Sequence, residues 1–123
     1  MDYFHLSEDK QDVLNMSNLG LAYLGDGVYE VMVRAWLCLH GKLTPGRLHR
    51  AALVEKILPA LTPEETQVFK RARNASPHSY PKGATRGEYQ TATGLEALFG
   101  WLYLRGETDR LNALFETMME GEE

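Results

Sequence analysis

Hydrophobic residues recur at three- and four-residue spacing along most of this chain, which is the spacing of amphipathic α-helices. No stretch shows the strict alternation of a β-strand, so the sequence predicts an all-α fold. Capping signals mark several helix starts, most completely at residues 62–65, where Thr, Pro, Glu and Glu form a capping box. The expected helices are Leu6 to Leu14, Leu19 to His40, one starting at Thr44-Pro45, Thr62 to Asn74, Glu88 to Arg105, and one starting at Thr108.

The second expected helix, 19–40, is apolar around most of its circumference and ends at Gly41. Such a helix is buried, either in the core of its own subunit or against a second copy of the chain. The wide apolar surface favours a homodimer formed mainly through Val28 to Leu39. The apolar positions are Leu21, Leu24, Val28, Val31, Met32, Ala35, Trp36 and Leu39.

Residues 74–87 form a long segment of turn residues, whose two prolines and two glycines a helix cannot accommodate. Loops of this length in compact domains are either functional or disordered. This one combines basic residues with His78 and Tyr80, a composition that suits a binding loop.

The chain has 123 residues, enough for one hydrophobic core, so we expect a single domain over residues 1–123. Its hydrophobic content of 44% and charged content of 24% are those of a soluble globular protein without a membrane span. The acidic start has no secretory signal pattern. The single cysteine, Cys38, excludes an intrachain disulfide framework and a cysteine-based zinc site, and its two leucine neighbours favour a small core residue. A cytoplasmic protein is expected.

Charge is unevenly distributed along the chain. The net charge is −4, but residues 1–12 and 107–123 hold ten of the 17 acids and two of the 13 bases, which leaves 11 bases against 7 acids between them. Residues 66–87 contain no acid and five bases: Lys70, Arg71, Arg73, Lys82 and Arg86. Such a segment is typical of a phosphate-binding surface, and a solvated helix face is the alternative.

Two acids stand in otherwise apolar segments, Asp26 within 21–30 and Glu96 within 93–100. A carboxylate among core residues loses hydration, so we expect a positive group between the two. Glycines flank both acids, as if to leave room for an approaching group. Because Mg²⁺ prefers oxygen ligands and keeps several waters, two carboxylates on packed helices are enough to hold it. Purely structural pairing of the acids is the alternative.

Asp26, Glu30 and Arg34 recur every fourth residue and therefore lie on one face of their helix. Glu30 and Arg34 suit an intrahelical ion pair worth about 0.2–0.5 kcal/mol, which leaves Asp26 unexplained. The four histidines share no ligand-like spacing, so no rival metal site is expected.

Five motifs in the same order resemble the ribonuclease III endonuclease-domain family, most closely its small bacterial branch, Mini-ribonuclease III. The resemblance covers the chain from Leu19 to Leu114. The motifs are Leu24-Gly-Asp-Gly-Val-Tyr-Glu30, Arg47-Leu-His-Arg50, Phe69-Lys-Arg-Ala-Arg-Asn74, Tyr89, and Thr93-Gly-Leu-Glu-Ala-Leu-Phe-Gly100.

The resemblance implies an all-helical homodimer that cleaves double-stranded RNA. It places the catalytic metal, Mg²⁺ with Mn²⁺ as a substitute, on Asp26 and Glu96, where a metal-activated water attacks the phosphodiester. Larger members of the family carry two further carboxylates at the positions of Ala22 and Thr93. The resemblance also implies maturation of the large-subunit (23S) ribosomal RNA precursor, with a large-subunit ribosomal protein as a candidate partner.

Other residues are expected to serve this centre. The basic side chains would neutralise RNA phosphates and recognise A-form shape more than sequence, while Asn74 orients the start of the loop. His49 is explained equally well as a surface residue. The expected RNA contacts are Lys70, Arg71, Arg73, Asn74, Lys82, Arg86 and His49, and the expected supporting residues are Glu30, Arg34 and Thr93. A non-catalytic RNA-binding or ribosome-assembly dimer and a helical protein adaptor are the alternative functions.

The chain departs from the family pattern at three places. Ala72 stands where the arginine motif usually has glycine, and Gly27 replaces another small residue, which should matter little. The stretch between His49 and Leu58 is shorter than in relatives by about eleven residues, which is roughly three helical turns. Either the central helix is truncated or the sequence lacks residues there.

Overall fold

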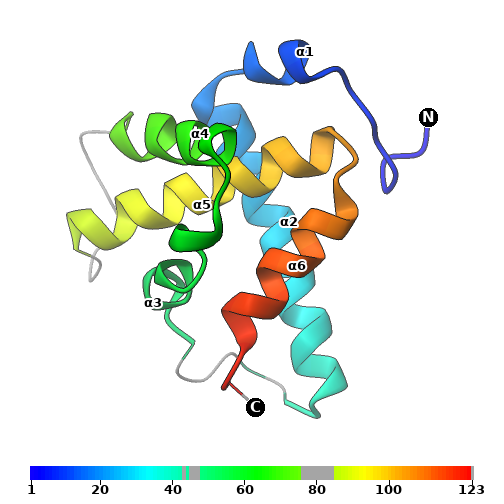
Figure 1. The fold of residues 1–123 in the computed structure, drawn as a ribbon. Helices are drawn as coiled ribbons and strands as arrows, with labels where there is room; N and C mark the ends of the chain where they lie inside the picture. Colours follow the sequence, from blue (N-terminus) through cyan, green and yellow to red (C-terminus); the bar gives the residue numbers. More distant parts are fainter. Residues whose placement is uncertain (43, 45–47, 76–84, 123) are drawn as a thin grey trace.

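The computed structural model describes residues 1–42, 44, 48–75 and 85–122, and within them every regular element is a helix (Figure 1). The all-α prediction is confirmed. The elements in chain order are α1 (Lys10–Leu14), α2 (Asn18–Leu39), α3 (Arg50–Glu55), the 3₁₀ turn η1 (Leu58–Ala60), α4 (Pro63–Asn74), α5 (Arg86–Leu104) and α6 (Thr108–Met119).

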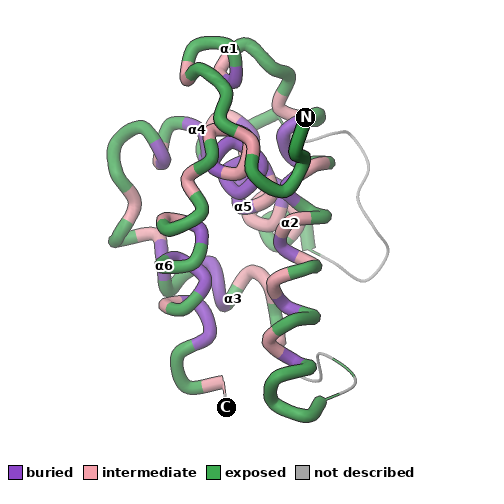
Figure 2. The backbone as a smooth tube through the Cα atoms, turned by 90° about the vertical axis from the view of Figure 1, so that its right-hand side faces the viewer, coloured by how far each residue is buried: buried purple, intermediate pink, exposed green. Residues whose placement is uncertain are grey.

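Helix α5 is the centre of the molecule. It packs against α2, α3, α4 and α6, and between Thr93 and Leu102 every residue except Glu96 is buried (Figure 2). Helices α4 and α3 lie on opposite sides of it in Figure 1, and α2 crosses it. The helix that is buried on nearly all sides is therefore α5, over residues 93–102. Among the described residues, no helix is both long and apolar enough to cross a membrane.

Helix α2 has one buried face and one exposed apolar face. The buried face holds Leu21, Ala22, Gly25, Tyr29, Val33 and Leu37. On the opposite side Val31 is 66% exposed and Leu39 is 85% exposed, so much of the apolar circumference of this helix lies outside the core. Cys38 is also exposed, and the expectation that it is a core residue was wrong, because position 38 falls outside the stripe that faces α5.

Two glycines let the backbones of α2 and α5 approach each other closely. A Cβ atom on Gly25 would overlap the backbone carbonyl of Glu96, and one on Gly100 would overlap the carbonyl oxygen of Leu21. Gly94 gives room to a different neighbour, because its Cβ would lie 2.7 Å from the Phe69 ring. The flanking glycines therefore serve helix packing. Gly27 has no neighbour within 4 Å and takes no part in it.

Most predicted helix boundaries are confirmed, including the Thr62–Glu65 capping box of α4, and Ser17 caps the start of α2. Three starts differ. Helix α1 begins at Lys10 rather than Leu6, because the Glu8 N–H donates to the Leu104 carbonyl (2.8 Å) and Asp9 caps the helix. Helix α3 begins at Arg50 rather than at the Thr44-Pro45 signal. Helix α5 begins at Arg86, two residues early, because Thr85 and Glu88 form a second capping box.

Two basic side chains connect α6 to α4 and to the end of α3. Arg110 of α6 pairs with the buried Glu65 of α4 through two hydrogen bonds of 2.7 and 2.8 Å. Burial works to raise the pKa of Glu65, but the bonds from Arg110 and the Thr62 backbone prevail and lower it. Lys56, directly after α3, donates its Nζ to the carbonyls of Met118 (3.1 Å) and Glu120 (2.8 Å) at the end of α6. These bonds fix where α3 lies.

The glycine contact predicts a large and position-specific effect of added bulk. Gly100→Ala should lower the free energy of unfolding by about 3 kcal/mol or more, because the new methyl group has no space against the α2 backbone. Gly87→Ala is the matched control on the same helix: it meets nothing within 4 Å and should gain up to about 1 kcal/mol from helix propensity. Urea unfolding of both variants measures the difference. Equal stabilities would show that α2 and α5 adjust freely at their crossing.

Candidate active site

The crossing of α2 and α5 brings Asp26 and Glu96 to one positively charged group. The Arg50 side chain, from the first turn of α3, donates from Nη1 to Asp26 Oδ1 (3.0 Å) and to Glu96 Oε2 (3.2 Å). The prediction of a positive group between the two acids is confirmed, and in the structure that group is a guanidinium.

A third acid completes the cluster. Arg50 Nη2 donates to Glu30 Oε1 (2.9 Å), and Glu30 Oε2 accepts a longer bond of 3.4 Å from Arg34 Nε. The predicted Glu30–Arg34 pair is thus present and is the weaker of the two contacts of Glu30. The Arg50 guanidinium also lies over the Tyr29 ring, 4.4 Å from its centroid, which favours the cation further.

The acids differ in their access to water. The Glu96 side chain is 17% exposed, whereas that of Asp26 is 52% exposed and that of Glu30 is 41% exposed. The expectation that both acids stand among core residues holds for Glu96 alone. Asp26 follows Gly25 on the helix and so lies at the edge of the buried face of α2, beside Arg50.

Burial governs the protonation of Glu96. Loss of hydration raises its pKa to about 7, and the nearby charges of Asp26 and Glu30 raise it too, against the opposing effect of Arg50. For Arg50, burial favours the neutral form, but Glu96 and Asp26 prevail and raise its pKa. The arginine therefore stays charged, while Glu96 is ionised only in part at neutral pH.

The donor set fits a hard divalent cation. Two carboxylate oxygens from different helices converge on a single point, which Arg50 Nη1 marks, and oxygen ligands of this kind suit Mg²⁺. Within the described residues no group of three or more His, Cys, Asp or Glu side chains is arranged to hold a metal by itself. The protein would therefore supply two carboxylates and leave the other positions to water and substrate.

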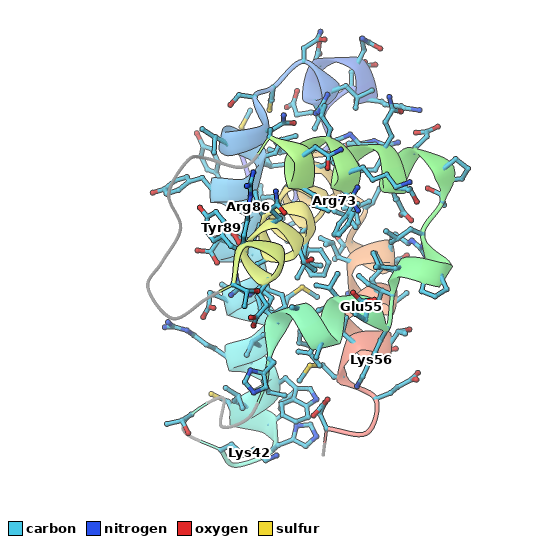
Figure 3. The ribbon with its side chains drawn as sticks, turned by 90° about the vertical axis from the view of Figure 1, so that its left-hand side faces the viewer. Lys42, Glu55, Lys56, Arg73, Arg86 and Tyr89 are labelled. Atoms are coloured by element: carbon cyan, nitrogen blue, oxygen red, sulfur yellow. The ribbon has the colours of Figure 1, made fainter. Side chains whose placement is uncertain are left out.

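The predicted basic residues divide into two groups. Lys70 and Arg86 are exposed, and Arg73 lies over the Phe69 ring (5.8 Å) with its Nε donating to Asn74 Oδ1 (3.2 Å). Arg73, near the end of α4, and Arg86, at the start of α5, lie at the same end of the molecule (Figures 1 and 3). Lys82 falls outside the described residues.

Arg71 belongs to the second group. Its Nε donates to Asn18 Oδ1 (2.7 Å) and its Nη1 to the Leu14 carbonyl (3.2 Å), so it connects α4 to the start of α2. Its geometry favours a structural role over the phosphate contact that we expected.

The remaining expected residues are placed as follows. His49 is the exposed residue that precedes α3, and its side chain makes no capping hydrogen bond. Thr93 is buried, and its hydroxyl donates to the Tyr89 carbonyl one turn earlier (2.9 Å). Thr93 therefore stabilises α5 locally.

Arg50 is the residue of the site that sequence patterns alone did not single out. It stands in the Arg47–Arg50 motif, but nothing in that motif shows where its side chain lies. The need for a cation beside two partly buried acids was the available signal. A cavity of about 450 Å³ adjoins it, lined by Tyr29, Glu30, Val33, Arg34, Leu37, Leu48 and Arg50.

Comparison with known proteins gives one consistent family. The Ribonuclease III domain family matches residues 19–107. The chain is 41% identical to a Mini-ribonuclease 3 of Symbiobacterium thermophilum, over 84% of this chain and 88% of the relative, and 37% identical to a Mini-ribonuclease 3 of Enterococcus faecalis, over 85% and 89%. A crystal structure of a Fusobacterium nucleatum protein superposes with a TM-score of 0.75 at 28% identity, covering 87% of this chain and 96% of that one.

The same comparison bears on the length of the chain. The alignment with the Symbiobacterium protein extends over 114 residues, whereas 84% of 123 residues is about 103, so about 11 aligned positions have no residue in this chain. That number agrees with the shortening expected between His49 and Leu58. In the structure α3 has only six residues.

The buried acid predicts an unusual dependence of stability on pH. Glu96 holds its proton up to about pH 7 in the folded protein but releases it near its ordinary value of 4.5 when unfolded. Its contribution is therefore fully present below about pH 4.5 and is lost as the pH rises through 7. With a chelator present, Glu96→Gln should remove this slope and be more stable than the wild type at pH 8 by about 1–3 kcal/mol.

Urea unfolding at pH 5, 6, 7 and 8 tests this. Glu116→Gln, on an exposed position of α6, is the control and should keep the wild-type slope. A Glu96→Gln protein that is less stable at pH 8 would show that the pair with Arg50 outweighs the burial of Glu96.

Proposed function

Since this chain belongs to the ribonuclease III family and is an endoribonuclease of that type, we propose that it cleaves double-stranded RNA with a Mg²⁺ ion held by Asp26 and Glu96. The observation that carries the proposal is the convergence of these two carboxylates on a single point. Mn²⁺ would bind the same oxygen donors.

In this proposal the chain's own residues bind the Mg²⁺ ion and orient it toward the RNA. Asp26 and Glu96 hold the ion from two helices whose spacing is fixed by backbone contact at Gly25 and Gly100. A bound Mg²⁺ would lower the pKa of a coordinated water and stabilise negative charge on the phosphate oxygens. Because Asp26 is half exposed and Glu96 is not, the open side of the site lies toward Asp26, where an RNA strand has access.

We also propose that Lys70, Arg73 and Arg86 contact RNA phosphates, with Lys82 as a further contact. The support is the exposure of Lys70 and Arg86, the partial exposure of Arg73 and its bond to Asn74, and, for all four, the absence of acids from residues 66–87. Phosphate contacts of this kind recognise the A-form helix and not its sequence.

The wider biological role rests on the resemblance alone. We propose that residues 1–123 act as one catalytic domain in the cytoplasm and that the substrate is the large-subunit (23S) ribosomal RNA precursor. A large-subunit ribosomal protein is the proposed partner for presenting that RNA.

We further propose that two copies pair through the exposed face of α2. That face carries Val31 and Leu39, and a mainly apolar cavity of about 430 Å³ opens on it between α2 and α6. Large exposed apolar patches mark protein interfaces. The lining residues are Phe4, Leu24, Gly27, Val28, Val31, Met32, Tyr103, Thr108, Leu111 and Asn112.

A non-catalytic RNA-binding dimer is the second candidate. It is favoured because, among the described residues, two carboxylates and no third contact Arg50 Nη1, and because an arginine lies between those two. Incubating the protein with a perfect RNA duplex, in Mg²⁺ and in EDTA, separates the two: the enzyme yields fragments with 5′-phosphate ends in Mg²⁺ only, and the binding protein yields none.

The metal ligands predict a separation of activity from binding. Asp26→Asn and Glu96→Gln should each lower the Mg²⁺-dependent cleavage rate by at least about 10²-fold, because a neutral amide replaces a charged ligand, while duplex binding and helical content persist. Single-turnover cleavage of a labelled duplex gives the rates, and Glu116→Gln is the control. Wild-type cleavage by both variants would remove these acids from the active site.

The proposed phosphate contacts predict the salt dependence of binding. In the Glu96→Gln background, the logarithm of duplex affinity should fall linearly with the logarithm of salt, and Arg73→Ala, Lys82→Ala and Arg86→Ala should each reduce the slope by roughly 0.7–0.9. Lys10→Ala, far along the chain and paired with Glu64, is the control and should leave the slope unchanged. An unaltered slope in all three variants would mean that the RNA lies elsewhere.

The exposed apolar face predicts a dimer that a single charge disrupts. The wild type should have a dimer mass by light scattering at micromolar concentration, and Val31→Asp should have a monomer mass, because a carboxylate is costly within an apolar interface. Met16→Asp, at a partly exposed methionine before α2, should remain a dimer. A wild-type monomer would contradict the proposed pairing.

A further inference from the structure

One side chain holds all three acids of the site. Arg50 shares Nη1 between Asp26 (3.0 Å) and Glu96 (3.2 Å) and gives Nη2 to Glu30 (2.9 Å). The two edges of the guanidinium therefore have different partners: one faces the proposed metal ligands, and the other faces an acid that we do not assign to the metal.

The Nη1 position is the one that a divalent cation on the same two carboxylates would have to take. Mg²⁺ requires oxygen atoms at 2.0–2.1 Å, closer than the 3.0 and 3.2 Å at which both carboxylates now contact nitrogen. An arginine and a divalent cation cannot share that space, because they overlap and repel each other in a partly buried setting.

A cavity beside Arg50 can accommodate its guanidinium in a second position. The cavity of about 450 Å³ beside it is lined by Glu30, Arg34 and Tyr29, so the guanidinium can withdraw from Asp26 and Glu96 and still keep its bond to Glu30. Only the Arg50 side chain has to move. The backbone of α3 stays in place, because Lys56 anchors the end of that helix to α6.

We propose that Arg50 is a built-in competitor of the divalent cation: its Nη1 holds the position between Asp26 and Glu96 until metal binding displaces the guanidinium toward Glu30. The inference rests on the proposed function and deepens it. Arg50 is in this view a positioning residue, which keeps the two carboxylates together when no metal is bound and lowers the metal affinity of the site.

The test is calorimetric titration of Mn²⁺ into the full chain, without RNA. Arg50→Gln should bind Mn²⁺ at least about tenfold more tightly than the wild type, because the ion no longer displaces a cation. Lys10→Gln is the control: it removes one positive charge from a pair with Glu64 that takes no part in this cluster, and its affinity should stay within about twofold. Unchanged or weaker binding by Arg50→Gln, or an equal gain in Lys10→Gln, would overturn the proposal.

A third titration distinguishes this inference from the proposed function. Glu96→Gln should lose Mn²⁺ binding. If Glu96→Gln binds like the wild type, the metal site itself is misassigned. If Glu96→Gln loses binding and Arg50→Gln gains none, the metal site stands and the competition by Arg50 is refuted.

A measurement on the wild type decides the question even if Arg50→Gln does not fold. Saturating Mg²⁺ should shift the assigned Arg50 Nε–Hε resonance in NMR spectra and leave that of Arg105, which pairs with Glu107, in place. An unmoved Arg50 signal, with the Glu96 amide shifted by Mg²⁺, would show that metal and arginine coexist.

Discussion

Backbone contact between α2 and α5 is the constraint on which the site depends. With glycine at positions 25 and 100, the two helices meet without side chains between them. Only at this separation do the carboxylates of Asp26 and Glu96 reach a single guanidinium nitrogen. The same crossing buries Glu96 and leaves Asp26 at the margin, so it sets both the geometry and the unequal hydration of the pair.

The site collects more negative charge than its packing favours. Three acids surround one arginine, and the most buried of them has its pKa raised to about 7. A buried, negatively charged Glu96 lowers the stability of the fold. The buried apolar residues of α5 and the bidentate Glu65–Arg110 pair stabilise the fold at other places. Sites that bind cations are expected to carry such unfavourable charge.

The sequence predicted the helices well and singled out two acids that the fold brings to one arginine, because periodicity, capping residues and an acid in an apolar run are local signals. It predicted partners poorly. Arg50 and Arg71 differ in role only through the tertiary contacts they make, with Asp26 and Glu96 in one case and with Asn18 and the Leu14 carbonyl in the other. Likewise, Cys38 has apolar neighbours in sequence but lies outside the stripe of α2 that faces α5. Composition does not encode which side of a helix faces a neighbour.

The hydrogen bonds from Lys56 connect the helix that carries Arg50 to the end of α6. The carbonyls that end α6 have no partner within the helix, and a lysine from the residue after α3 satisfies two of them, 62 and 64 positions away in sequence. Helix α3 carries Arg50 at its other end. Fraying of the last turn of α6, or a fusion tag attached after Glu123, would release Lys56 and loosen the helix that presents the arginine. A tag at the amino terminus would spare this connection, which matters for how the protein is produced for study.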